Sequence, residues 1–364
     1  MSEPAPRREG PRFAALGGRD DAPAGASRLD LNTAPAESAG YRERLAQALE
    51  RVSLAAYGDE RALPLREALA AHEAIPAERI FVAGGSMAVL ERLLSAFAGP
   101  GASAISFDPG YAGCERLCEA LRIELRRAGR AHDFSLDPER VEAAIAAGAA
   151  PDVVLFCHPG NPTGQAERPD SVGRACDLLP GSLIVVDEAY VDFAAAGTMA
   201  GLLGEHPNLA IVRTFSKAWA LAGARLGYAL ASERIVAELF ERQLPGAVSA
   251  LTQAAGIAAL AEDAGARRER IAAICRERDR IGAALDRMPG VQAWPSEANF
   301  VLFRVPGAAA DVLAACTEAG VLIRDMGARQ GMEDCLRVTV GEPDANERFL
   351  AAAVSVRAGV GAAR

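Results

Sequence analysis

The sequence predicts an α/β fold in which a mostly parallel sheet lies between helices and is followed by a smaller α+β unit. Short apolar stretches such as residues 152–157 and 182–186 alternate with helical patterns. Strands that are apolar along their whole length are typical of a parallel sheet covered on both faces. Beyond a helical stretch at about residues 250–287, the pattern changes to a second, smaller set of strands.

The composition is that of an ordinary globular protein. The chain has 364 residues, enough for two domains, and half of them are hydrophobic. Its net charge of -9 argues against nucleic acid or an anionic membrane as a partner. No apolar run approaches the roughly 18 residues of a membrane helix. Charges at Arg12, Arg19 and Asp20 interrupt any signal-peptide core, so we expect a cytoplasmic protein.

The cysteines and histidines indicate neither disulfides nor a metal site. Seven cysteines at irregular spacing form no disulfide framework in a chain of this length, and we expect buried, reduced thiols. Four scattered histidines show no ligand spacing, so no metal is expected.

Three regions follow one another along the chain. Residues 1–40, rich in Pro, Gly, Ala and Arg at first, are expected to form an N-terminal arm. A large domain at 41–245 contains an amphipathic stretch at 87–98 and predicted strands at 79–83, 104–107, 152–157, 182–186 and 210–214. A small C-terminal domain at 246–364 begins with the long helical stretch and contains predicted strands at 294–305, 320–324 and 335–340.

Polar residues directly after three of these strands are the candidates for chemistry. Asn161, Asp187 and Lys217 each follow a strand, and ligands bind beyond the carboxyl ends of strands in open α/β sheets. Asp187 needs a strong partner at the end of an apolar strand, although an ordinary helix N-cap is the alternative. A lone lysine is usually a surface charge. Lys217, however, lies between aromatic residues, where a lysine can lose its proton and attack carbonyls.

Together these residues fit pyridoxal phosphate. This cofactor needs a lysine for its aldehyde and an aspartate that keeps its ring nitrogen protonated. It also needs donors to the ring hydroxyl, a stacking aromatic ring and a phosphate site, which a helix N-terminus provides. Lys217 is the candidate for the aldehyde and Asp187 for the ring nitrogen. Asn161 and Tyr190 are the candidates for the ring hydroxyl, and Tyr111 for the stacking ring. The candidates for the phosphate are Gly85, Ser86, Ser216 and Arg225.

Several spaced segments resemble class I and II aminotransferases, and the resemblance covers about residues 30–350. The segments are HPGNPTGQ at 158–165, VVDEAY at 185–190 and RTFSKAWALAGAR at 213–225. Three more are similar to the histidinol-phosphate aminotransferase branch of that family: PSEANFVLF at 295–303, LIRD at 322–325 and CLRVTVG at 335–341.

The resemblance implies a fold type I transferase with a seven-stranded sheet, working as a homodimer that shares its active sites. It implies ping-pong transfer of an amino group between an amino acid or amino phosphate and a 2-oxo acid. Lys217 would hold the cofactor and carry the proton, and Asp187 would bind the pyridine nitrogen. Asn161 and Tyr190 would bind the ring hydroxyl, and Tyr190 is included among the catalytic residues.

Other positions match further family residues. Met87 and Thr214 belong to the expected cofactor-binding set, and Tyr57 would reach the cofactor phosphate of the partner subunit. Three residues are expected to bind substrate: Asn32, Arg324 and Arg337. As alternatives, Asn32 would be an ordinary turn residue, and the two arginines would be strand residues that form ion pairs with Asp325 or Glu342.

The chain departs from the family pattern where substrates bind. Segments 31–35 and 244–252 lack the usual asparagine and aromatic residues, which leaves the donor open. One alternative is a lyase that uses the same cofactor, such as a decarboxylase of phosphorylated threonine, because chemistry depends on the site and not on the fold. Another is a non-catalytic regulator. It would need a DNA-binding module, which neither the length before Tyr41 nor the charge offers.

Overall fold

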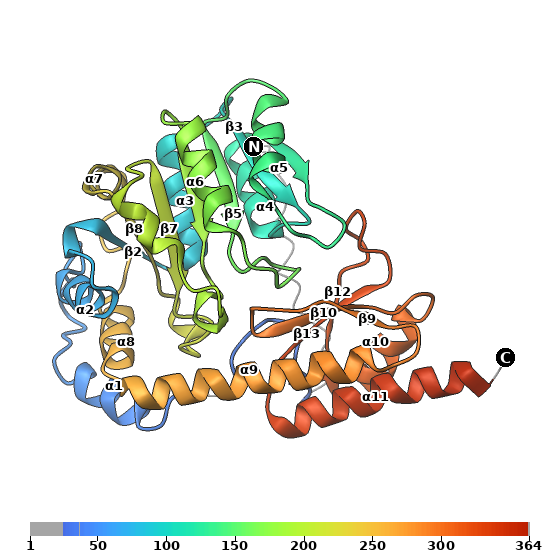
Figure 1. Ribbon diagram of the computed structural model, residues 1–364. Coiled ribbons are helices and arrows are strands. Elements are labelled where there is room, and N and C mark those ends of the chain that lie inside the picture. The colour runs from blue at the N-terminus through green and yellow to red at the C-terminus, as the bar shows by residue number, and fades with distance from the viewer. Residues whose placement is uncertain (1–24, 36, 363–364) are drawn as a thin grey trace, which may run out of the picture.

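The computed structural model describes residues 25–35 and 37–362 of the chain, shown in Figure 1. Most of the predicted N-terminal arm, residues 1–24 and residue 36, therefore lies outside the described residues. Close to the start of the described part, β1 (Ser27–Arg28) pairs in parallel with β11 (Val321–Leu322). This pairing joins the beginning of the chain to its C-terminal third.

A seven-stranded sheet forms the larger part of the molecule. Its strands, in spatial order, are β2 (Ile80–Ala83), β8 (Gly227–Ala231), β7 (Leu209–Thr214), β6 (Leu183–Asp187), β5 (Val153–Cys157), β3 (Ser103–Asp108) and β4 (Glu124–Gly129). All neighbours pair in parallel except at β8, which is antiparallel to both β2 and β7. The predicted, mostly parallel seven-stranded sheet is thus confirmed, although β4 and β8 were not predicted.

Both faces of this sheet are covered by helices, because side chains of a strand alternate between the two faces. In β6, Ile184 and Val186 belong to one apolar core, and Leu183 and Val185 belong to the other. The first core includes α2 (Leu63–Glu73), α5 (Pro138–Ala146), α6 (Pro169–Leu178) and α8 (Ala250–Leu260). The second includes α3 (Ser86–Phe97), α4 (Ala112–Leu121) and α7 (Glu233–Glu241).

The antiparallel strand β8 has a consequence for the site. Residues 215–226 connect β7 to β8 without a crossover helix, which only a parallel pair would require. This connection contains the short 3-10 helix η4 (Ala222–Ala224). It therefore keeps Lys217 and Arg225 at the edge of the sheet where the parallel strands end.

A smaller antiparallel sheet follows, in the order β12 (Arg324–Asp325), β13 (Cys335–Thr339), β10 (Phe300–Arg304) and β9 (Gln292–Ala293). It packs with α9 (Ala264–Asp286), α10 (Ala309–Glu318) and α11 (Pro343–Ala362). In Figure 1, α9 runs along the base of the molecule from the side of α8 to the smaller sheet. The predicted strand at 294–305 is shorter than expected, because a loop precedes Phe300.

The predicted helical stretch at 250–287 is two helices, α8 and α9. Asp263 separates them and caps α9 by accepting a hydrogen bond from the Ala266 backbone at 2.9 Å. The remaining elements are α1 (Tyr41–Leu49) and the 3-10 helices η1 (Ala77–Arg79), η2 (Val191–Phe193) and η3 (Met199–Gly204). The helix α1 packs on α8, where the Tyr41 hydroxyl donates to the Ala255 carbonyl at 3.3 Å.

Three features bear on the classes of function. All seven cysteines are unpaired, and every one except Cys275 is buried. Within the described residues, no cluster of three or more His, Cys, Asp or Glu side chains is arranged to hold a metal ion. No helix in this part of the chain has the length and apolar character needed to cross a membrane.

Candidate active site

A cavity of 470 Å³ lies at the carboxyl ends of the parallel strands, between the two sheets. Its lining contains all of the predicted site residues except Gly85 and Tyr57. The members are Asn32, Ser86, Met87, Tyr111, Asn161, Asp187, Tyr190, Thr214, Ser216, Lys217, Arg225, Arg324 and Arg337. The strand ends that the sequence predicted to converge therefore do converge.

Lys217 lies where the β7–β8 connection meets the N-terminal segment. Its Nζ donates a hydrogen bond to the Leu31 carbonyl at 3.0 Å and lies 5.5 Å from the centre of the Tyr190 ring. Burial, followed by the positive charge of Arg337, lowers the pKa of Lys217 to about 7. A large fraction of this amine is therefore unprotonated at neutral pH and able to act as a base or nucleophile.

Asp187 ends β6 and is buried. Burial raises its pKa to about 6, opposed by a hydrogen bond from the Ala189 backbone and by the charge of Lys217. The Ala189 N–H donates to Asp187 Oδ1 at 3.1 Å, which is a turn contact. The next helix, η2, begins at Val191 with Tyr190 as its N-cap, so Asp187 is not a helix N-cap. The carboxylate also lines the cavity, so it is available to a cationic ring nitrogen.

A chain of buried hydrogen bonds connects the candidate hydroxyl-binding and anion-binding residues. The Tyr190 hydroxyl accepts from Asn161 Nδ2 at 3.1 Å and from Asn32 Nδ2 at 3.0 Å. Arg337 Nη1 donates to Asn161 Oδ1 at 2.5 Å. Asn32 has a left-handed backbone, at φ 54°, which asparagine tolerates better than most residues. Its Oδ1 accepts from the Thr339 hydroxyl at 3.1 Å.

A second group of side chains surrounds the N-terminus of α3. The Ser216 backbone N–H donates to Thr214 Oγ1 at 3.1 Å, and Arg225 Nη1 donates to the Ser216 hydroxyl at 3.4 Å. Gly85 precedes the helix at φ 98°, and a Cβ there would lie 2.6 Å from Arg225 Nη2. The N-terminus of α3, two hydroxyls and a guanidinium thus meet at one end of the cavity, as a phosphate requires.

Arg324 and Arg337 are direct partners in the β12–β13 pair, so two guanidinium-bearing residues stand side by side at the cavity. Burial, together with the positive charge of Arg324, lowers the pKa of Arg337 to about 10, while the neighbouring Tyr190 opposes this shift. The hydrogen bonds of Arg337 go to Asn161 and, at 3.0 Å, to the Asp30 carbonyl, while its buried Nε has no partner within the described chain. Such a cluster suits an anion.

The sequence reasoning missed some of the lining. Arg116 belongs to α4, whose first turn follows Tyr111, and this position on the same helix was a signal available in the sequence. Arg329 comes from the loop between β12 and β13 and forms an ion pair with Glu115 of α4. Nothing in a loop sequence indicates such a contact across the cavity.

The donor set of this cavity fits pyridoxal phosphate. The amine of Lys217 and the carboxylate of Asp187 lie in the same lining as the amide of Asn161 and the ring of Tyr111. The phosphate group has a separate place at α3, which a side chain at Gly85 would obstruct. A buried, unpartnered Nε of Arg337 remains for a further anionic group.

Tyr57 lies outside this cavity, and 98% of its surface is exposed. Leu54, Leu244 and Leu251 are also exposed large apolar residues. Their segments are neighbours, because a Cβ at Gly58 would lie 3.2 Å from the Ala250 side chain.

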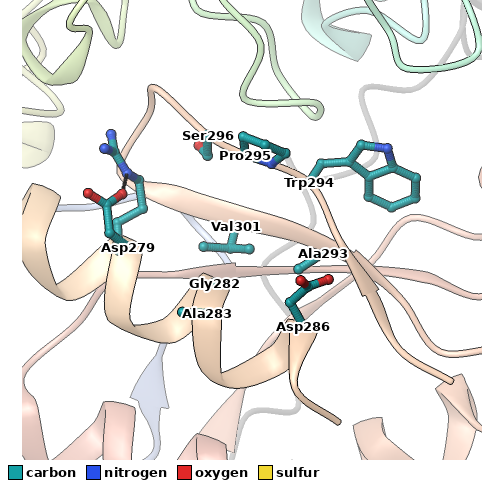
Figure 2. A pocket seen from close by; sticks show the side chains of 10 residues that line it. Asp279, Gly282, Ala283, Asp286, Ala293, Trp294, Pro295, Ser296 and Val301 are labelled. Carbon is teal, nitrogen blue, oxygen red and sulfur yellow. Dashed lines mark hydrogen bonds and ion pairs between the residues drawn. The ribbon is translucent and has the colours of Figure 1, made fainter. Parts of the chain in front are cut away.

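A second, smaller hollow of 240 Å³ lies between α9 and residues 293–296. Figure 2 shows Asp279 and Asp286 on the helix side, with Pro295 and Ser296 opposite them. Arg278, in the same lining, makes hydrogen bonds of 3.3 Å to the Phe193 and Ala298 carbonyls. This hollow contains none of the predicted site residues.

Comparisons with known proteins agree with this geometry. The model of the family described as aminotransferase class I and II matches residues 25–353. Over 306 residues the chain is 40% identical to histidinol-phosphate aminotransferase of Mycolicibacterium smegmatis, covering 81% of this chain and 78% of that protein.

Solved structures agree as well. Histidinol-phosphate aminotransferase from Sinorhizobium meliloti, in complex with pyridoxal-5'-phosphate, is 26% identical with a TM-score of 0.84, covering 92% of this chain and 91% of that one. L-threonine-O-3-phosphate decarboxylase from Porphyromonas gingivalis is 24% identical with a TM-score of 0.77, covering 90% and 98%, which is a likeness of fold alone.

Proposed function

The chain belongs to the class I and II aminotransferase family, and from this premise we propose that its amino donor is an amino phosphate of the histidinol-phosphate type. It is an aminotransferase that depends on pyridoxal phosphate. The similarity to the Mycolicibacterium smegmatis enzyme supports this donor class. The observation that carries the proposal is the adjacent pair Arg324 and Arg337 in the same cavity as Lys217, because two guanidinium groups match a phosphate dianion.

Each residue of the cavity receives a proposed role from its chemistry. Asp187 would hold the proton on the cofactor's ring nitrogen, and Asn161 and Tyr190 would bind the ring hydroxyl. Tyr111 would stack on the ring. The phosphate would be held by Gly85, Ser86, Met87, Thr214, Ser216 and Arg225. Arg324 and Arg337 would bind the anionic end of the substrate, with Asn32 closing the wall of the cavity beside Tyr190.

The proton transfers belong to Lys217. When bound, pyridoxal phosphate supplies an aldehyde for the amino group and a ring that accepts the electron pair of the broken bond. With the cofactor in place, the free amine of Lys217 would take the proton from the donor's α-carbon and later give it up again, acting as base and acid in turn. A pKa near 7 supports both directions of transfer at neutral pH.

The test is a panel of amino compounds, added one at a time to the yellow holoenzyme without any oxo acid. The panel contains histidinol phosphate, histidinol, phosphothreonine, and aromatic and basic amino acids. We expect histidinol phosphate to bleach the yellow colour with one equivalent of a carbonyl product, and histidinol to react far more slowly. Equal reaction of both compounds would contradict the proposed phosphate recognition. Carbon dioxide release from phosphothreonine with retention of colour would support the lyase alternative.

The chain is also proposed to act as a homodimer with shared sites. The support is the exposed Tyr57 and the neighbouring apolar side chains Leu54, Leu244 and Leu251, which a partner subunit would cover. Segment 244–251 also passes close to the chain before α3, because a Cβ at Gly84 would lie 4.0 Å from the Ala247 carbonyl oxygen. Size-exclusion chromatography with light scattering would measure the molar mass in solution, and we expect that of a dimer. A monomer with full activity would contradict the proposed dimer.

Two further expectations stay proposals. A cytoplasmic location is supported by seven unpaired cysteines, which suit a reducing compartment. The division into an N-terminal arm at 1–40, a large domain at 41–245 and a small domain at 246–364 with an interdomain helix is supported by the separate apolar cores of the two sheets.

A further inference from the structure

Four polar side chains outside the cavity form a buried cluster behind it, which we call the Arg213 network: Glu73, Glu188, Arg213 and Tyr228. The Glu188 carboxylate accepts hydrogen bonds from Arg213 Nε at 3.0 Å and Nη2 at 2.9 Å. On its other side, Arg213 Nη1 donates to Glu73 Oε2 at 2.5 Å. The Tyr228 hydroxyl donates to Glu73 Oε1 at 2.5 Å. One guanidinium therefore bridges two carboxylates.

The network joins the strands β6, β7 and β8 to the helix α2. Glu188 directly follows Asp187 at the end of β6, and its side chain also accepts from the Met199 backbone at 2.6 Å. Arg213 is in β7, four residues before Lys217, and its direct partner across the β7–β8 pair is Tyr228. Glu73 is the last residue of α2. Four elements are thus fixed to one another immediately behind Asp187 and Lys217.

Stability alone does not account for this arrangement. The side chains of Glu188, Glu73 and Arg213 are only 0%, 7% and 12% exposed. Removing such charges from water is costly, and apolar residues of the same volume are commonly as stabilising. The planar guanidinium, in contrast, fixes both the distance and the angle between two carboxylates. Burial and the neighbouring Glu73 raise the pKa of Tyr228, so its hydroxyl remains a donor to Glu73.

A second set of contacts holds the chain on the other side of Lys217. The guanidinium of Arg267, on α9, lies 4.1 Å from the centre of the Trp219 ring. Arg270, one turn further along α9, donates to the Ala218 carbonyl at 2.5 Å. Lys217 therefore lies between an anchor at Arg213, four residues before it, and contacts with α9 at the two residues that follow it.

We propose that the Arg213 network is a positioning device that sets the location of Asp187 relative to Lys217. Glu188 and Arg213 act through their neighbours and touch neither cofactor nor substrate. The inference rests on the roles proposed above for Asp187 and Lys217. Loosening the network lets the two strand ends shift independently, and a displacement of about 1 Å costs a reaction on the order of 100-fold in rate.

Three variants test this proposal in the holoenzyme. Arg213→Lys keeps the charge but cannot bridge both carboxylates, and Glu188→Gln keeps the size but removes one charge. A charge-free variant, Glu73→Gln/Glu188→Gln/Arg213→Met, replaces the ion pairs with neutral side chains of similar volume and keeps an acceptor for the Met199 backbone. Arg130→Lys is the matched control, because the Arg130–Glu167 pair is comparably buried, at 3% and 1% exposure, and Arg130 also donates to the Phe107 and Phe134 carbonyls, which belong neither to β6 nor to β7.

The readouts are kcat, the KM of the donor, the thermal midpoint and the pH midpoint of the cofactor's visible absorbance. For Arg213→Lys and the charge-free variant, we expect kcat to fall about 10- to 100-fold with little change in KM, together with a shift of the absorbance midpoint. The charge-free variant is expected to keep its thermal midpoint. Arg130→Lys is expected to lower the thermal midpoint and leave the other readouts unchanged.

Two outcomes overturn the proposal. One is a charge-free variant with wild-type kcat and absorbance, and the other is an equal loss of kcat in the Arg130→Lys control. If the charge-free variant does not fold, Glu188→Gln and Arg213→Lys decide the question by the same readouts. A separate variant tests the roles proposed for Asp187 and Lys217. If Lys217→Ala retains the colour and turnover of the wild type, those roles are wrong, independently of the result for the Arg213 network.

Discussion

Gly227 leaves room for the phosphate end of the cavity, and adding a single methyl group there should weaken cofactor binding. The residue is in β8, directly opposite Ala83 of β2 and Thr214 of β7. A Cβ at this position would lie 2.3 Å from the Ser86 nitrogen and 2.5 Å from the Gly85 carbonyl carbon. Both are backbone atoms at the start of α3, so no side-chain rotation relieves the clash.

The size of the effect follows from these distances. Ordinary contact begins near 3.4 Å, so the first turn of α3 must move by about 1 Å in Gly227→Ala. Overpacking of this kind costs about 1–3 kcal/mol. If this whole cost falls on binding of the cofactor phosphate, the Kd of pyridoxal phosphate rises about 5- to 150-fold, since 1.4 kcal/mol corresponds to a factor of ten.

The assay is titration of the cofactor-free protein with pyridoxal phosphate, followed by the visible absorbance, and repeated with pyridoxal, which lacks the phosphate. We expect the Kd for pyridoxal phosphate to rise and the Kd for pyridoxal to change little. Gly223→Ala is the control, because a Cβ there meets no atom within 4 Å. Wild-type affinity of Gly227→Ala for pyridoxal phosphate would refute the reasoning, as would an equal loss for both compounds.

Three further predictions concern the charged residues of the cavity. Asp187→Asn should slow exchange of the donor's α-proton about 100-fold or more, because the ring nitrogen loses its counter-charge; proton NMR in deuterium oxide measures this, and wild-type exchange contradicts the role. Arg337→Lys should raise the KM for a phosphate-bearing donor about 10- to 100-fold with a smaller change in kcat, whereas an unchanged KM excludes it as the anion clamp. In the cofactor-free protein, the pKa of Lys217 is about 7 against its ordinary 10.5. The buried charge therefore destabilises the fold fully below about pH 7, and stability rises between about pH 7 and 10.5, where only the unfolded chain keeps the proton. Lys217→Met should flatten this rise in urea unfolding at pH 7 and 9, and an unchanged slope would refute the assignment.

The strands that the sequence predicts well are buried on both faces. Val153–Cys157 and Leu183–Asp187 are continuous apolar runs bounded by turn residues, and their predicted ends differ from the structure by one residue. By contrast, β4 is an edge strand of the sequence ELRRAG, with exposed charges and no apolar run. The strand β8, GYALA, follows the lysine segment so closely that its sequence gives no sign of a reversed direction. Local patterns reveal burial but not pairing.

The same distinction applies to the site. The placement of Asp187 and Lys217 in the cavity was predictable, because each follows an apolar strand and the family motifs surround both. The contacts of Asn32 with Tyr190 and Thr339 span 158 and 307 residues of the chain, and no local pattern encodes such distances. The ion pair of Arg329 with Glu115 was missed for the same reason.

The helix α9 gives the molecule a fixed internal length. Its 23 residues extend about 34 Å, from the contacts with Ala218 and Trp219 to the loop before β9. Ile274, Ile281 and Leu285 are buried along one side of it. An added residue would lengthen the helix by about 1.5 Å and turn everything after it by about 100°. Surface loops can therefore change in length without moving the site, whereas an insertion in α9 would change the position of Arg324 and Arg337 relative to Lys217.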